Sequence, residues 1–529
     1  MADVAMDLSG SDFPGQSPLD VEVLAKIAGQ MFKEFGGSSS LPASRDLDLS
    51  ALDLRGQAPV DEDLLSKIAA GIATKAPAGE ALPASPQGLP STPQATPSFY
   101  FLGQYRAKTA ADIPALPEAV HPPFDAASVR ADFPILSERI NGRPLIWLDN
   151  AATTQKPQSV IDRLRVFYTH ENSNVHRAAH ELARRSTDAY EAARETVRRF
   201  LGASKVEEIV FVRGTTEGIN LVAQSWGRKN VRAGDEILIT WLEHHSNIVP
   251  WQMLCGETGA KLRVAPVDDR GQVILQEYER LLSDRTKIAS ISQVSNALGT
   301  ITPVQQMTEM AHRYGAHVLI DGAQAVAHVG VNVRALDCDW YVFSGHKLFG
   351  PTGIGVVYGK APLLETMPPW QGGGSMIRDV TFEKTEYNTI PMRFEAGTGN
   401  IADAVGLAAA IEYLERIGLE NVTRHEHELL THATRLLSDV PGLRIIGTAA
   451  EKAGVISFVM DGIPVEEIGK ALNAEGIAVR AGHHCAQPIL RRFGLESTVR
   501  PSFALYNTFG DVDALGAAVR RIRASKPSP

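Results

Sequence analysis

A serine, a histidine and a lysine lie close together after an apolar run in residues 342–355. Residues 340–344 predict a buried strand, and Ser344, His346 and Lys347 stand at its end, before a turn rich in glycine and proline. Strands of an α/β sheet present functional groups at their carboxyl ends. A lysine amine held in a dry pocket or near another cation becomes a Schiff-base nucleophile, whereas a solvated lysine, the more common case, stays protonated.

The ends of two further predicted strands carry residues suited to a phosphate and to a flat ring. The strand at 208–212 is followed by Arg213-Gly-Thr-Thr-Glu-Gly218, in which glycine, hydroxyl groups and free amides open a helix. Such a helix start binds phosphate, although a plain capped helix has the same composition. The strand at 236–240 leads to Glu243-His-His-Ser246, where a histidine either stacks on a ring or is an ordinary polar loop residue.

A carboxylate follows a fourth predicted strand, at 317–320, in the segment Asp321-Gly-Ala-Gln324. A buried carboxylate requires a cationic partner, and a protonated pyridine nitrogen would provide one. A phosphate cradle, a stacking ring, a pyridinium partner and a Schiff-base lysine are the contacts that pyridoxal 5'-phosphate requires for its electron-sink chemistry. Their occurrence on successive strand ends predicts this cofactor.

The elements that would position these groups begin near Asp125, where strands and helices start to alternate. Strands are predicted at 145–148, 208–212, 236–240, 261–265, 288–292, 317–320 and 340–344, and amphipathic helices at 159–170 and 180–201. Because helix-length segments separate most strands, we predict an α/β fold over residues 125–392, with a large, mostly parallel sheet covered on both faces.

The pattern changes after residue 392. Helices are predicted over 403–417 and 422–440, followed by shorter strands and a helix over 465–475. We therefore predict that residues 393–529 form a smaller C-terminal α+β domain. This domain would carry the only cysteine that lies beside histidines.

That cysteine is Cys485, in the segment Arg480-Ala-Gly-His-His-Cys485, which follows a predicted strand at 477–479. A free cysteine is most often a small buried hydrophobe. Zinc binding is a poor interpretation, because adjacent residues make a poor tetrahedral set and no Cys-x-x-Cys partner exists. The third interpretation is a nucleophilic thiolate whose pKa is lowered by the neighbouring histidines. Arg500 has the planar fork that binds a substrate carboxylate, or forms a structural salt bridge.

Together these motifs resemble those of the class V branch of fold-type I pyridoxal-phosphate enzymes. Within that branch they resemble the SUF-type (group II) cysteine desulfurases, over about residues 128–523. The motifs are Arg213-Gly-Thr-Thr-Glu-Gly-Ile-Asn220, Glu243-His-His-Ser-Asn-Ile-Val-Pro-Trp-Gln252, Val294-Ser-Asn-Ala-Leu-Gly299, Asp321-Gly-Ala-Gln-Ala-Val326, Phe343-Ser-Gly-His-Lys347, Arg393-Phe-Glu-Ala-Gly-Thr398 and Arg480-Ala-Gly-His-His-Cys485.

The resemblance implies a role for each residue of the candidate site. Lys347, Cys485 and His244 are implied as catalytic residues: the Schiff-base lysine, the nucleophile and the ring-stacking histidine. The other implied cofactor contacts are Asp321 to the ring nitrogen, Gln324 to the ring hydroxyl, Thr215, Thr216, Ser344 and His346 at the phosphate end, and Thr398 from the other subunit of a homodimer. Asn296 and Arg500 are implied to bind substrate, and no metal is expected.

The activity implied by the resemblance is conversion of L-cysteine to L-alanine, with the sulfur held as a Cys485 persulfide. The sulfur would pass to an acceptor protein, as in iron–sulfur cluster assembly, or be stored. Selenocysteine lyase shares these residues and is the alternative within enzymes. Among proteins that are not active enzymes, the alternative is an interaction or cargo protein with a vestigial enzyme core.

Composition excludes several other classes. The 529 residues carry a formal net charge of -9, which provides no basic surface for nucleic acid. No apolar run is long enough to span a bilayer, and the amino terminus lacks the features of a secretory signal. The three cysteines are too few and too scattered for a disulfide framework. A cytoplasmic protein without membrane or nucleic-acid partners is therefore expected.

Residues 1–124 have a different composition, with 14 of the 31 prolines and a net charge of -7. This composition predicts a flexible, largely disordered extension. Within it, Pro18-Leu-Asp-Val-Glu-Val-Leu-Ala-Lys-Ile-Ala28 returns as Pro59-Val-Asp-Glu-Asp-Leu-Leu-Ser-Lys-Ile-Ala69, which predicts short amphipathic helices at about 18–35 and 59–75. The extension resembles those of cysteine desulfurases packaged in encapsulin-type shells. This implies targeting to a protein nanocompartment or scaffold; docking on the enzyme itself is the alternative.

Overall fold

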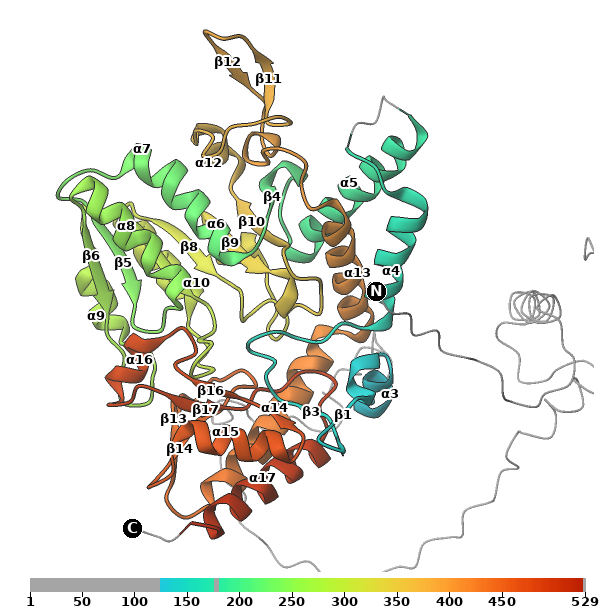
Figure 1. Cartoon of the computed structure of the whole chain (residues 1–529). Coiled ribbons are helices and arrows are strands. Elements are labelled where there is room, and N and C mark those ends of the chain that lie inside the picture. The colour runs from blue at the N-terminus through green and yellow to red at the C-terminus, as the bar shows by residue number, and fades with distance from the viewer. Residues whose placement is uncertain (1–123, 176–179, 527–529) are drawn as a thin grey trace, which may run out of the picture. The chain divides into compact units, whose positions relative to one another are not determined.

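The computed structural model describes residues 124–175 and 180–526 (Figure 1). The chain divides into two units, residues 1–113 and 114–529, and all described residues belong to the second. The two helical motifs predicted at 18–35 and 59–75 lie outside the described residues. Among the residues that are described, no helix is long and apolar enough to cross a membrane.

A seven-stranded sheet forms the centre of the described unit. Its strands are β4 (Ile209–Val212), β5 (Glu236–Thr240), β6 (Lys261–Ala265), β7 (Thr286–Ser292), β8 (His317–Asp321), β9 (Trp340–Ser344) and β10 (Gly355–Gly359). Their order is β4-β10-β9-β8-β7-β5-β6, and only β10 runs antiparallel to its neighbours. The prediction of a mostly parallel sheet is confirmed. The six predicted strands of this sheet lie within two residues of their observed ends.

Helices cover both faces of this sheet because its strands are apolar on both sides. In β9, Tyr341 and Phe343 pack into one buried cluster, while Trp340 and Val342 pack into a second cluster on the opposite face. The first cluster includes side chains of α4 (Gln158–Val166), α5 (Glu181–Leu201), α10 (Val304–Arg313) and α13 (Ile401–Ile417); the second includes α6 (Thr215–Val222), α8 (Val249–Thr258) and α12 (Ala361–Thr366). The predicted α/β class is confirmed.

A second, antiparallel sheet is built near the end of the chain. It has the order β13-β14-β17-β16, from β13 (Leu443–Ile446), β14 (Ser457–Met460), β16 (Arg480–Gly482) and β17 (Thr498–Arg500). A third buried cluster joins it to α14 (Leu419–Ser438), α15 (Val465–Ala474) and α17 (Phe509–Ala524). Figure 1 shows these elements together, below the large sheet. The exact domain boundary at residues 392 and 393 stays a prediction.

The start of the described core is paired with this C-terminal region. Strand β3 (Ile146–Trp147) runs parallel to β15 (Ile477–Ala478), and the Leu148 carbonyl accepts a hydrogen bond from the Ser502 N–H at 2.7 Å. Residues 146–148 therefore belong to the layer that also carries Cys485, although they precede the large sheet in sequence.

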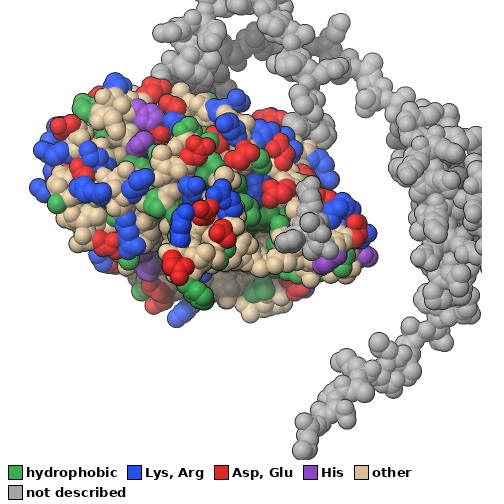
Figure 2. Space-filling model, turned by 90° about the horizontal axis from the view of Figure 1, so that it is seen from above, with side chains coloured by type: hydrophobic (Ala, Val, Ile, Leu, Met, Phe, Trp, Pro, Cys, Tyr) green, Lys and Arg blue, Asp and Glu red, His purple; other side chains and the backbone are tan. Residues whose placement is uncertain are grey.

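The remaining elements are short. They are α3 (Ala126–Ala131), α7 (Arg228–Asn230), α9 (Leu275–Leu281), α11 (Val333–Leu336), α16 (Gln487–Arg492), the pair β1 (Arg139–Ile140) and β2 (Arg143–Pro144), and the hairpin of β11 (Ile377–Val380) and β12 (Thr385–Tyr387). The hairpin projects from the upper edge of the unit in Figure 1. Acidic and basic side chains are intermixed on the face seen in Figure 2, so that face offers no continuous basic surface.

Candidate active site

A cavity of about 450 Å³ lies at the carboxyl ends of the parallel strands. Segments that follow β4, β5, β7, β8 and β9 line it, together with the loop that carries Cys485. Of the twelve predicted site residues, eleven line this cavity: Thr215, Thr216, His244, Asn296, Asp321, Gln324, Ser344, His346, Lys347, Cys485 and Arg500. The twelfth, Thr398, lies outside it and contacts Asn174 Oδ1 at 3.4 Å.

One end of the cavity is the amino terminus of α6. The N-cap residue Gly214 provides no side-chain cap, so amides of the first turn remain available to an anion. The Thr215 N–H donates to Ser344 Oγ at 2.8 Å, and the two hydroxyl oxygens are also 2.8 Å apart. Gly355 makes this arrangement possible, because a Cβ there would lie 2.5 Å from the Gly214 Cα. The result is a cradle of amides and hydroxyls suited to a phosphate.

The middle of the cavity places an amine opposite a carboxylate and an amide. The Lys347 ammonium donates to Gln324 Oε1 at 3.3 Å. Desolvation lowers the pKa of Lys347 to about 8, although the negative charge of Asp321 acts to raise it. Burial in turn raises the pKa of Asp321, whose Oδ1 accepts from the Ala323 N–H at 2.9 Å. Near neutral pH a useful fraction of Lys347 is therefore the free amine, and Asp321 is available to a cation.

The His244 ring is held neutral within the cavity. Its Nδ1 accepts from the Ser246 N–H at 3.1 Å, so the proton of the neutral ring is on Nε2. Desolvation and the charge of Lys347 lower the pKa of His244 to about 3. A neutral, oriented imidazole of this kind is suited to stacking on an aromatic ligand.

Arg500 lies on the side of the cavity formed by the second sheet. It is buried, donates through Nη1 to the Asn296 carbonyl at 2.8 Å, and pairs with Asp149 Oδ1 at 3.3 Å. The other carboxylate oxygen of Asp149 accepts from the Arg480 Nε and Nη2 at 3.0 and 2.9 Å. Burial lowers the pKa of Arg500 to about 10, so it remains a cation at neutral pH. Asp149 thus holds two guanidinium groups at the cavity.

Three buried polar atoms in the cavity wall have no hydrogen-bond partner among the described residues. They are Asn296 Oδ1, Arg500 Nε and His484 Nδ1. Buried polar groups are normally paired, so unpaired atoms that gather at one cavity indicate a polar ligand. With the amide cradle at α6, the Lys347 amine and the Asp321 carboxylate, the residues present fit pyridoxal 5'-phosphate and an amino acid beside it.

Two further residues hold groups of this site in place, and no local sequence pattern singles out either role. The partners of Asp149, Arg480 and Arg500, are more than 300 positions away in the chain. Glu243 is fully buried and accepts from the Ser292 hydroxyl, the Asn247 amide and the Thr240 hydroxyl at 2.6–2.7 Å. The presence of a carboxylate directly before His244 was the available signal for Glu243.

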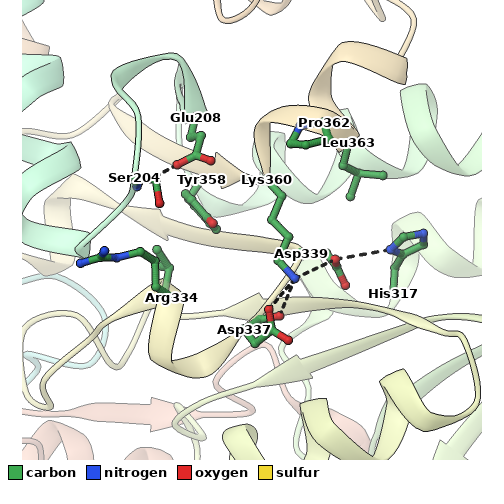
Figure 3. Close-up of a pocket in the computed structure, with 11 residues that line it drawn as sticks. Ser204, Glu208, His317, Arg334, Asp337, Asp339, Tyr358, Lys360, Pro362 and Leu363 are labelled. Atoms are coloured by element: carbon green, nitrogen blue, oxygen red, sulfur yellow. Dashed lines mark hydrogen bonds and ion pairs between the residues drawn. The ribbon is translucent and has the colours of Figure 1, made fainter.

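A second cavity, of about 480 Å³, lies at the opposite edge of the sheet, where β8 and β9 begin (Figure 3). Its charged side chains pair with one another: Lys360 contacts Asp337 at 2.7 Å and Asp339 at 3.3 Å, and Asp339 also contacts His317 at 3.5 Å. Among the described residues no cluster of His, Cys, Asp or Glu is arranged to hold a metal ion. We therefore treat this cavity as structural.

Asp339 provides a test of that structural role. Burial alone would raise its pKa, but hydrogen bonds from His312 and His317 and the charge of Lys360 hold it well below the usual range. We expect Asp339→Ala to lower the free energy of unfolding at pH 7 by about 2 kcal/mol, because the buried Val318 N–H, His312 and Lys360 lose the carboxylate that they contact. Urea denaturation followed by circular dichroism measures this change.

The effect of Asp339 has a defined dependence on pH. Since its pKa is lower in the folded than in the unfolded state, the stabilisation is present above the unfolded value of about 4 and is lost as pH falls towards the folded value. The difference between wild type and Asp339→Ala should therefore shrink below about pH 4. Asp513→Asn, which breaks the more exposed pair with His432, is the control and should change stability by less than about 1 kcal/mol. An unchanged stability of Asp339→Ala at pH 7 would contradict the assignment.

The chain belongs to the aminotransferase class-V family, whose sequence profile matches residues 146–515. This class, together with the site, identifies pyridoxal 5'-phosphate as the cofactor, and that prediction is confirmed. Within the family, the chain is 72% identical over 400 residues to a cysteine desulfurase of Synechococcus elongatus, covering 76% of this chain and 64% of that relative. The chain thus spans less than two thirds of that relative's length.

Two further proteins match over nearly their whole length. A cysteine desulfurase of Escherichia coli O8 is 50% identical over 400 residues, which cover 75% of this chain and 98% of that protein. The crystal structure of the Escherichia coli cysteine desulfurase CsdA has a TM-score of 0.71 at 40% identity, covering 76% of this chain and all of CsdA. The fold prediction is confirmed by this structure.

Proposed function

We propose that the protein is a cysteine desulfurase that converts L-cysteine to L-alanine and holds the sulfur as a persulfide of Cys485. The observation that carries the proposal is a single cavity that contains the lysine, carboxylate and amide cradle for pyridoxal phosphate, a buried arginine, and a cysteine at its mouth. Cys485 is the only exposed cysteine among the described residues. The cysteine desulfurase relatives support the same assignment.

Each residue of the cavity has its own role in the proposed reaction. Bound pyridoxal phosphate supplies an electron sink for the substrate's α-carbon. Lys347 would hold the cofactor through its amine and, when that amine is free, would move the α-proton at its Nζ, for which its pKa of about 8 is suited. Asp321 would pair with the ring nitrogen, and His244 would stack on the ring. Thr215, Thr216, Ser344 and His346 would hold the phosphate, and Gln324 would bind the ring hydroxyl.

The substrate is bound and cleaved on the side of the second sheet. Arg500 binds the carboxylate of cysteine through the N–H groups that its bonds to Asn296 and Asp149 leave available. The Asn296 side chain, whose Oδ1 has no partner among the described residues, contributes a further polar contact. The Cys485 thiolate attacks the sulfur of the substrate, the carbon–sulfur bond breaks, and alanine leaves.

The assignment is tested by incubating the protein with L-cysteine and measuring alanine together with the mass of the Cys485 peptide. A gain of one sulfur atom on Cys485 and one alanine per site in the first turnover would support it. A protein that binds pyridoxal phosphate but forms no alanine would overturn it. The same assay with selenocysteine separates a desulfurase from a selenocysteine lyase.

Several finer assignments rest on this one. The loop between β16 and α16 is only four residues long and leaves Cys485 exposed, which supports the SUF-type (group II) arrangement, in which an acceptor protein docks over the mouth to collect sulfur. A homodimer is supported by Thr398, which lies outside the cavity of its own chain. Its segment is fixed by Glu395, which pairs with the buried Arg194 at 2.6 and 3.0 Å.

For the N-terminal extension we propose targeting to an encapsulin-type shell or another scaffold, in the cytoplasm. Two weak helical motifs on one tether suit multivalent docking, because the second contact is intramolecular. Removing residues 1–123 should leave an active enzyme that no longer co-assembles with a co-expressed encapsulin-type shell protein, as measured by size-exclusion chromatography. Phe124 is retained because its ring packs 4.7 Å from that of His425.

A full-length variant provides the matched test of the extension. Replacing Leu24, Ile27, Leu65 and Ile68 with Ser should reproduce the loss of co-assembly, since these residues hold the apolar positions of the two predicted helices. Unchanged co-assembly of this variant would argue against docking through the motifs. Loss of cofactor or of folding on truncation would indicate instead that the motifs dock on the enzyme.

A further inference from the structure

Two histidines form hydrogen bonds with the backbone N–H and the backbone carbonyl of Cys485. The Cys485 N–H donates to Nδ1 of the His483 ring at 3.0 Å, and the Cys485 carbonyl accepts from the backbone N–H of His245 at 2.9 Å. The two imidazole rings are stacked, with centroids 5.9 Å apart and planes inclined by 25°. His245 directly follows the ring-stacking His244, so this contact links the cofactor side of the cavity to the nucleophile.

The backbone of the Cys485 loop requires such support. His484 and Cys485 have φ angles of +54° and +52°, in the left-handed region that non-glycine residues rarely adopt. Each such residue is strained relative to the right-handed region. Two in succession persist only where surrounding contacts compensate, and the bonds from His483 and His245 are contacts of this kind.

The histidine rings near Cys485 are neutral. A His483 ring that accepts a hydrogen bond at Nδ1 carries its proton on Nε2, because a charged ring has no acceptor atom. Burial, Arg500 and Arg480 lower the pKa of His484 to about 2. Burial also lowers the pKa of His245, against a hydrogen bond with Gln487. This arrangement gives these histidines a hydrogen-bonding role rather than a cationic one.

We propose that His483 and His245 are positioning residues for Cys485 and that both act as neutral rings. His483 acts through the Nδ1 lone pair that accepts the Cys485 N–H, and His245 acts through its backbone N–H and by stacking on His483. Together they fix the loop so that the sulfur at the mouth of the cavity is placed for attack. The inference rests on the proposed desulfurase activity and adds two residues to which that proposal gives no role.

An exchange of His483 separates the positioning role from a charge role. His483→Ala removes the acceptor, whereas the side-chain oxygen of His483→Asn can accept the same N–H two residues on and cannot become a cation. In the holoenzyme, His483→Ala should slow first-turnover alanine formation by roughly 10–100-fold, because small misplacements of a reacting group are costly. His483→Asn should restore the rate to within about threefold of wild type, with the cofactor absorbance unchanged in both.

His245 is tested in the same way. His245→Phe keeps a flat ring against His483 and should retain most of the rate, whereas His245→Ala should lose about tenfold. His427→Ala, at an exposed position of α14, is the control and should match wild type. The rate of Cys485 alkylation by iodoacetamide, followed by mass spectrometry, provides a readout independent of turnover. We expect the alkylation rate to differ from wild type in His483→Ala and His245→Ala. It should match wild type in His483→Asn and His245→Phe.

The outcomes distinguish this inference from the proposed function. If wild type forms no alanine from cysteine, the desulfurase assignment fails, and the alkylation series alone decides on the positioning role. If wild type is active and His483→Asn is as slow as His483→Ala, a titrating or cationic role replaces positioning. If both Ala variants match wild type in alanine formation and alkylation, the histidines do not position Cys485.

Discussion

Lys347→Ala will not attach pyridoxal phosphate covalently and will form no alanine from cysteine. Among the described residues, Lys347 is the lysine that lines the cavity, and its amine faces Gln324 and the buried Asp321. Under the proposed function, removing it takes away both the group that holds the cofactor and the base that moves the α-proton. The expected loss of turnover is on the order of 10³-fold or more, since two catalytic functions disappear together.

Covalent attachment is measured by borohydride reduction and peptide mass spectrometry, alongside the absorbance of the protein. Lys156 provides a matched control, because desolvation also lowers its pKa to about 8 although its ammonium donates to the Thr154 carbonyl outside the cavity lining. Lys156→Ala should keep the cofactor attached at Lys347. A Lys347→Ala protein that still carries covalently bound cofactor would refute the assignment.

Cys485→Ala will keep the cofactor and lose alanine formation. Cys485 makes no hydrogen bond to Lys347, Asp321 or His244, so the absorbance of the bound cofactor should remain that of wild type. Without the thiolate no group accepts the substrate sulfur, and turnover of cysteine should fall by at least about 10²-fold.

Cys255 is the control for this second prediction. It is half-buried on α8, and burial raises the pKa of its thiol, so Cys255→Ala should keep full activity. Sulfur release at a near wild-type rate by Cys485→Ala, without added thiol, would show that another group is the nucleophile. Activity towards selenocysteine does not decide the question, because selenium leaves more readily than sulfur.

The strands that carry the site could be predicted because each signal is local. β5 and β9 are buried, mostly apolar runs that end in a polar residue, Thr240 and Ser344, and the predicted and observed bounds of β5, β6 and β9 agree. β10 was missed, since only ten residues separate it from β9 and a parallel neighbour needs a helix-length connection. The hairpin of β11 and β12 was missed because exposed strands with charged residues lack a clear apolar period.

The contacts between distant segments could not be predicted in this way. Asp149 pairs with Arg500 across 351 positions, and no local pattern specifies that pairing. The hydrogen bond from the Cys485 N–H to His483 Nδ1 was equally hidden, because it depends on the backbone conformation of the loop. A Gly-His-His-Cys segment is compatible with cationic, metal-binding and neutral histidines until its backbone geometry is known.

The pairing of β3 with β15 sets the order in which a growing chain can become functional. By the time residue 360 has emerged from the ribosome, Asp321, Ser344 and Lys347 have all been synthesised, and their strands can associate. β3 still lacks its partner, and Asp149 lacks both arginines, until residues 477–500 follow. A nascent chain could therefore acquire its cofactor residues well before it can bind the substrate carboxylate or present Cys485. Because residues 477–500 are synthesised late, the proposed transfer of sulfur to Cys485 cannot begin until the fold is nearly complete.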